Sequence, residues 1–129
     1  MTRNAEQTIT EFWERQNSGD YTQVVPLFAH DAVLVDPIYG EFRGKEAIAG
    51  FMGKMVTEMG AQETRFSMLE IGGAGGGEGE EGVAWAQWIA HTPAGDIHGC
   101  GLYRVRDGLM TYYKDYMNPP AQNTEASGS

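Results

Sequence analysis

Two aspartates, Asp36 and Asp115, are the residues of this chain whose surroundings best suit acid–base chemistry. Asp36 ends a short apolar run at 32–36, and because Pro37 follows it the backbone there is expected to be extended. Asp115 lies in an alternating run at 109–118. A carboxylate among aromatic and methionine side chains resists ionisation, which moves its pKa toward the range that a general base or acid needs. Two such groups facing one enclosure could divide acid and base work between them.

Both aspartates also have a structural interpretation, which the residues alone leave open. Asp36 could form the turn typical of an Asp-Pro pair or cap a helix, and Asp115 could pair with a nearby basic residue. The histidines His30, His91 and His98 show no metal-ligand spacing, so no metal site is predicted.

Apolar residues recur at helical spacing early in the chain and at alternate positions later, which predicts helices first and strands afterwards. Pro26 removes a backbone donor from the second helix, so that helix is expected to be short or bent. The order predicts an α+β fold, with a curved antiparallel sheet and helices packed on one face. The expected helices lie at 9–16, 21–29 and 45–59, the strands at 32–36, 62–71, 83–92, 97–105 and 109–118, and turn-rich connections at 39–44 and 72–82.

Alternation sorts the side chains of each predicted strand into two faces. Both faces carry large apolar groups, so we expect helices to cover one face and a second subunit of a homodimer to cover the other. His98 and Cys100 are expected at that interface, whereas Gly99 and Gly101 leave space on the opposite face for a bend or a ligand.

The bulk composition favours a single globular domain at 1–118 followed by a disordered tail at 119–129. A net charge of −9 argues against binding to nucleic acid or anionic membranes. One cysteine, Cys100, precludes an internal disulfide, and neither a signal peptide nor an apolar stretch of about 18 residues is evident, so a cytoplasmic location is expected. The glycine-rich run at 72–82 lacks the Lys and the Ser or Thr of a phosphate loop, and no cofactor is predicted.

Two segments of the chain carry a family resemblance. They read GDYTQVVPLFAHDAVLVDPIYGEFRGKEAIAGF and, much later, LYRVRDGLMTYYKDYMNP. From Phe12 to about Asn118 the chain resembles the nuclear transport factor 2-like superfamily, most closely its SnoaL-like polyketide cyclase, ketosteroid isomerase and limonene-epoxide hydrolase branches. The resemblance implies a cone-shaped α+β barrel, in which three N-terminal helices and the curved sheet enclose a deep apolar pocket. It also implies frequent dimerisation through the outer face of the sheet.

Carried over to single residues, the resemblance to ketosteroid isomerases implies half of their site. Asp36 falls where those enzymes place the aspartate that removes a proton next to a carbonyl. Their oxyanion-hole tyrosine aligns with Phe12, which has no hydroxyl, and their protonated aspartate aligns near Gly101, which has no side chain. Losing both donors would cost a steroid isomerase of that mechanism several kcal/mol of barrier.

The resemblance to epoxide hydrolases is also incomplete. Asp115 falls where those enzymes place one of two aspartates that flank a water, but their arginine aligns with Gln87 and their second aspartate with Ile89. What the alignment supplies is a pocket face that agrees with the strand alternation. The residues expected to bind substrate there are Phe12, Gln16, Tyr39, Phe51, Met55, Trp85, Gln87, Ile89, His91, Gly101, Tyr113 and Met117.

Three functions follow as hypotheses. The first is a cofactor-independent isomerase, cyclase or lyase that acts on a small hydrophobic substrate of polyketide or steroid type, with Asp36 as general base and Asp115 as a second acid or base. The second is hydrolysis or cyclisation of an epoxide by the same two carboxylates. The third is a non-catalytic module for apolar ligands or for dimerisation, which the loss of both known catalytic sets favours and the retained inward acids oppose.

Overall fold

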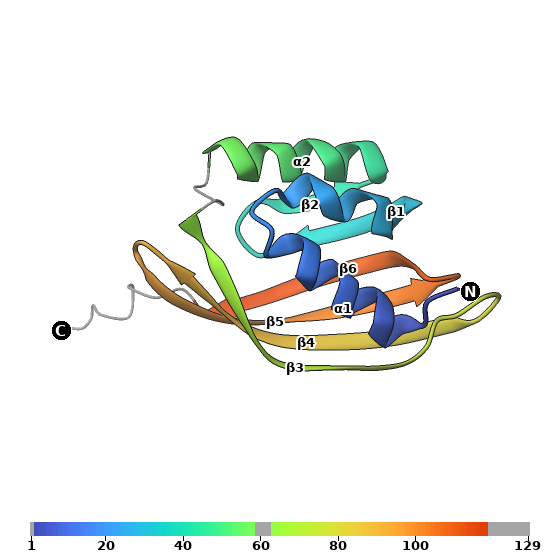
Figure 1. Ribbon diagram of the computed structural model, residues 1–129. Coiled ribbons are helices and arrows are strands. Elements are labelled where there is room, and N and C mark those ends of the chain that lie inside the picture. Colours follow the sequence, from blue (N-terminus) through green and yellow to red (C-terminus); the bar gives the residue numbers. More distant parts are fainter. Residues whose placement is uncertain (1, 59–62, 119–129) are drawn as a thin grey trace.

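The helices and the sheet of this protein form an α+β fold, seen in a computed structural model that describes residues 2–58 and 63–118 (Figure 1). The predicted tail at 119–129 and the predicted end of the third helix at Met59 lie outside the described residues. No helix within the described residues is long and apolar enough to cross a membrane.

Three helical segments precede or interrupt the first strands, as predicted. Helix α1 spans Ala5–Gln16 and begins with a capping box, in which Asn4 and Gln7 satisfy each other's backbone N–H groups. The second segment, η1, spans Tyr21–Leu27 and is a 3-10 helix that contains Pro26, so the prediction of a short or bent helix is confirmed. Helix α2 spans Lys45–Glu58.

Within the described residues, the helices pack on a single curled sheet of six strands that does not close into a barrel. Strand β1 pairs with β6 in parallel, so the prediction of a wholly antiparallel sheet is wrong at this one contact. The chain reaches β6 only after three hairpin-linked strands, and it then runs beside β1 in the same direction. In spatial order the strands are β2 (Gly40–Arg43), β1 (Phe28–Asp36), β6 (Leu109–Asn118), β5 (Gly95–Arg106), β4 (Glu81–Thr92) and β3 (Arg65–Gly75).

Two predicted connections are partly strand. Within 39–44, strand β2 folds back on β1 so closely that Gly40 pairs with Asp36. Within 72–82, strand β3 continues to Gly75, and a side chain on Gly72 would meet the ring of Trp85 at 2.5 Å. Glycine is needed here because an aromatic ring from the neighbouring strand covers the backbone, and this part of the run is strand where a turn-rich connection was predicted.

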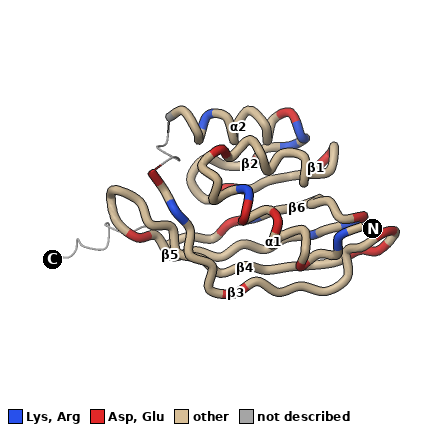
Figure 2. Tube along the Cα trace, in the orientation of Figure 1, with Lys and Arg blue, Asp and Glu red and all other residues tan. Residues whose placement is uncertain are grey.

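The helices lie on the concave face of the sheet. Helix α1 crosses β3 and β4, and α2 packs on β1 and β2 at the other side of the curl (Figure 1). Acidic residues gather at the β3–β4 turn near the start of α1, while Lys and Arg are spread over several elements (Figure 2).

Strand β4 turns a row of small residues toward the helices. Ala84, Ala86 and Ala90 are buried, and the single large side chain on that face, Trp88, covers Gly99 of the next strand. Small side chains let helix α1 approach the sheet closely.

Candidate functional site

A cavity of about 190 Å³ lies between the helices and the concave face of the sheet. Its wall is mostly aromatic and aliphatic, with five non-aromatic polar side chains among these groups. Eight residues predicted from the sequence to form the site line this cavity. They are Asp36, Asp115, Gln16, Tyr39, Phe51, Met55, Tyr113 and Met117.

Asp36 reaches the cavity from the end of β1 and also shapes the turn that follows. Its Oδ2 accepts hydrogen bonds from the backbone N–H groups of Ile38 and Tyr39, each at 2.9 Å. These two hydrogen bonds hold the carboxylate oxygen against the backbone of the turn. The turn interpretation and the cavity interpretation of Asp36 therefore hold together, and the turn fixes where the carboxylate points.

Asp115 reaches the same cavity from β6 in a very different environment. Tyr113 Oη donates a hydrogen bond of 3.0 Å to Asp115 Oδ2, while Oδ1 is buried without a hydrogen-bond partner among the described residues. Burial raises the pKa of Asp115 to about 8; the Tyr113 hydrogen bond lowers it, and the nearby Asp36 charge raises it. At neutral pH, Asp115 is therefore a neutral carboxylic acid with a proton to donate.

A chain of buried tyrosine and tryptophan side chains continues from Tyr113 into the core and supports Asp115. Trp13 Nε1 donates to Tyr103 Oη at 3.0 Å, and the Tyr103 ring lies against that of Tyr113 with centroids 4.5 Å apart. Burial raises the pKa of both tyrosines well above the ordinary value, so both stay protonated. Gly101 makes room for this chain, because a side chain there would meet Tyr103 Oη at 2.5 Å.

The predicted inward face of β4 is wrong. Trp85, Gln87, Ile89 and His91 lie on the outer face, because the alanine row with Trp88 faces the helices. The positions aligned with the arginine and second aspartate of epoxide hydrolases are therefore outside the cavity, so that catalytic set has no counterpart at these positions.

Two further predicted contacts are also displaced from the cavity wall. Phe12 is fully buried in the core, where its ring meets those of Trp13 and Tyr113 edge-on. Gly101 is buried beneath Tyr103. Both residues lie behind the cavity wall and not in it. Tyr113 and Asp115, two residues apart on one strand face, are the sequence signal for the buried acid.

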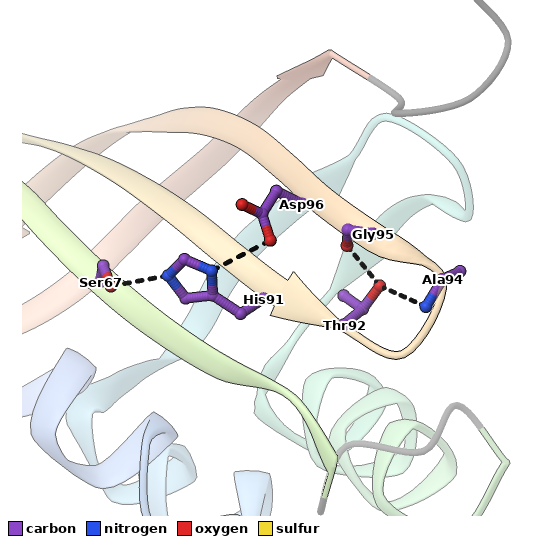
Figure 3. Close-up of polar contacts among 6 residues, drawn as sticks. All are labelled: Ser67, His91, Thr92, Ala94, Gly95 and Asp96. Carbon is purple, nitrogen blue, oxygen red and sulfur yellow. Dashed lines mark hydrogen bonds and ion pairs between the residues drawn. The ribbon is translucent and has the colours of Figure 1, made fainter.

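The outer face carries a second polar array, shown in Figure 3. Ser67 Oγ lies 2.7 Å from His91 Nε2, and His91 Nδ1 lies 3.0 Å from Asp96 Oδ1. These residue types also occur in hydrolytic triads. Here all three are exposed, on the side of the sheet opposite the cavity. The contacts tie β3, β4 and β5 together at one end of the sheet.

Comparison with known proteins identifies the family. The family model described as SnoaL-like domain matches residues 9–113, so the chain belongs to this family within the nuclear transport factor 2-like superfamily. No curated protein matches the sequence at a significant level.

Solved structures of low sequence identity share the fold. A protein from Kribbella flavida matches with a TM-score of 0.72 at 17% identity, over 96% of this chain and 98% of that chain. An NTF2-like protein of unknown function from Cytophaga hutchinsonii has a TM-score of 0.69 at 17% identity, over 92% and 94%. The Orange Carotenoid Protein of Anabaena (Nostoc), solved with canthaxanthin, has a TM-score of 0.69 at 16% identity, over 85% of this chain and 35% of that chain.

The raised pKa of Asp115 predicts that the protein loses stability as pH rises. The group holds its proton to about pH 8 in the folded state, but only to about pH 4 when unfolded. Between these values the folded state binds more protons, so the free energy of unfolding should fall by up to about 1.4 kcal/mol per pH unit from this group. Urea unfolding at pH 5, 6.5 and 8 measures this slope.

Asp115→Asn removes the titrating group and keeps an acceptor for Tyr113. The free energy of unfolding of this variant minus that of the wild type should therefore increase by about 2–4 kcal/mol from pH 5 to pH 8, because only the wild type loses stability through this group. Asp31→Asn, at an exposed position of β1, is the control and should follow the wild-type slope. Parallel curves for Asp115→Asn and wild type would contradict a neutral Asp115.

Proposed function

We propose that this protein is a cofactor-independent isomerase that moves a proton within a small, uncharged carbonyl compound. One observation carries the proposal: two carboxyl groups line one apolar cavity, and burial makes one of them, Asp115, a neutral acid at neutral pH. Asp36 is positioned by hydrogen bonds from two backbone N–H groups, whereas burial keeps Asp115 neutral. Such a pair supplies a base and an acid at the same pH.

The reaction begins with the substrate carbonyl oxygen accepting a hydrogen bond from protonated Asp115. Asp36 then removes a proton from the adjacent carbon, and the electron pair of the broken C–H bond moves toward the oxygen as an enolate. Asp36 returns the proton to another carbon of the conjugated system, so no atom is gained or lost. A donor aimed at the developing oxyanion lowers the barrier by about 2.7–4 kcal/mol.

Binding without turnover is the second candidate. The apolar wall of the cavity and the likeness to a canthaxanthin-binding protein support a ligand-binding module. The isomerase and the binding module differ in one requirement: the isomerase needs a base at the position of Asp36, whereas a pure binding module does not.

Replacing Asp36 by Asn should abolish proton transfer without unfolding the protein. The probe is conversion of cyclohex-3-enone to cyclohex-2-enone, followed by the absorbance of the conjugated product. We expect kcat/KM to fall by about 10²–10⁴-fold, which is the usual contribution of a positioned base. The wild-type rate should fall as pH rises through about 8, where Asp115 loses its proton.

Asp31→Asn is again the matched control, because Asp31 is on the same strand but exposed to solvent. Its rate should equal that of the wild type. Full activity of Asp36→Asn would rule out the proposed base, and absence of turnover by the wild-type protein on this and related enones would favour the binding module.

We also propose that the protein forms a homodimer through the outer face of the sheet. Large apolar side chains are exposed there on neighbouring strands, among them Trp85 and Leu102, which are paired in register. Lys114 pairs in register with Leu102, Arg104 pairs with Val83, and Glu70 lies beside Trp85. Charges of both signs suit a two-fold interface in which the same surface meets itself. The exposed free thiol of Cys100 on the same face suits a reducing cytoplasm.

Leu102→Glu should shift the protein to a monomer, because burying a carboxylate in an apolar interface is costly. Sedimentation velocity measures the change. Ile38→Glu is the matched control, since Ile38 is 64% exposed against 52% for Leu102 but lies in the loop after β1. A wild-type monomer at tens of micromolar, or dissociation by Ile38→Glu alone, would contradict this interface.

A further inference from the structure

Two buried polar atoms of the cavity wall take no part in the proposed reaction. Gln16 Oε1 and Trp88 Nε1 have no hydrogen-bond partner among the described residues, although both residues line the cavity. Gln16 is 8% exposed and Trp88 3% exposed, so bulk solvent does not reach them freely. Buried polar groups in folded proteins are nearly always paired. These two atoms therefore leave room for a partner that the described residues do not supply.

The chemistry of the two atoms defines that partner. The indole Nε1 can only donate a hydrogen bond, and the amide oxygen can only accept one. A hydroxyl group does both, since its oxygen accepts and its proton donates. The Asp36 anion in the same cavity disfavours a charged carboxylate ligand by repulsion.

The size of the cavity limits the rest of the ligand. A dry cavity of about 150 Å³ admits benzene, and sites for drug-sized ligands occupy about 300–1,000 Å³. A cavity of about 190 Å³ therefore suits one ring with small substituents and is too small to enclose a four-ring steroid. Met52, Met55 and Met117 on its wall allow small adjustments to ring shape.

We propose that Gln16 and Trp88 form a second polar subsite that selects an uncharged single-ring compound bearing both a carbonyl and a hydroxyl group. The hydroxyl donates to Gln16 Oε1 and accepts from Trp88 Nε1, while the carbonyl accepts from Asp115. The assignment of the carbonyl rests on the proposed function, whereas the hydroxyl subsite stands on the two unpartnered atoms. Gln16 and Trp88 thus determine which ketone the acid–base pair receives.

Calorimetric titration at pH 6.5 tests the subsite with probes that differ by one group. The probes are 3′- and 4′-hydroxyacetophenone, which carry both groups, acetophenone, which lacks the hydroxyl, and the matching ethylphenols, which lack the carbonyl. We expect at least one hydroxyacetophenone to bind about tenfold or more tightly than acetophenone, because the analogue leaves buried groups unpaired.

Gln16→Met keeps the length of the side chain and removes its amide, so it should abolish the preference for the hydroxylated probe while acetophenone binding stays the same. Gln23→Met, at an exposed position of η1, is the control and should keep the full preference. Trp88→Phe should weaken the preference in the same direction as Gln16→Met.

Three results would overturn the subsite. The first is equal binding of hydroxylated and unhydroxylated ketones to the wild type, which is expected if water alone hydrogen-bonds to the two atoms. The second is a preference for the hydroxylated probe that survives both substitutions. The third is no binding of any probe. The test is independent of turnover. The preference should persist in Asp36→Asn, and loss of catalysis with the preference intact would remove the isomerase proposal and leave the subsite standing.

Discussion

The burial of one carboxyl group, that of Asp115, is the constraint on which the rest of the site depends. Removing a carboxylate from water without a cation or several donors around it costs more than keeping its proton. Tyr113 provides one hydrogen bond, which is too little to restore the charged form. The protein therefore holds a neutral acid in an apolar cavity that a second carboxyl group, that of Asp36, also lines.

Several features of the sheet serve this arrangement. Gly101 has no side chain, so Tyr103 can lie over the backbone of β5 and pack beside Tyr113. Trp13 fixes the Tyr103 hydroxyl from the helix side. The tyrosine rings and Phe12 behind them exclude water from Asp115, which keeps its pKa high. In the family alignment, Gly101 stands near the protonated aspartate of ketosteroid isomerases and looks like the loss of a catalytic group. In this structure, the same glycine makes room for the tyrosines that pack beside Asp115, a different acid.

The sequence predicted the α+β class, the helix order and the position of Asp36, because each depends on local signals. Pro37 fixes the backbone at Asp36, and Pro26 shortens the second helix. The inward face of β4 could not be predicted in the same way. Trp85 and Trp88 place a large ring on each face, and alternation alone does not say which face meets the helices. The close packing of α1 against small residues decides it, and that is a tertiary contact. The parallel β1–β6 pair and the unpartnered atoms of Gln16 and Trp88 are likewise products of long-range packing.

Direct titration of the Asp115 carboxyl tests the central claim most simply. Carbon-13 NMR of protein labelled at aspartate carboxyl carbons, with Asp115→Asn used to assign the resonance, reports its protonation at each pH. A midpoint near 8 is the predicted result. A midpoint near 4, the ordinary value for an exposed aspartate, would mean that Asp115 is charged at neutral pH and that the cavity has no acid to pair with Asp36.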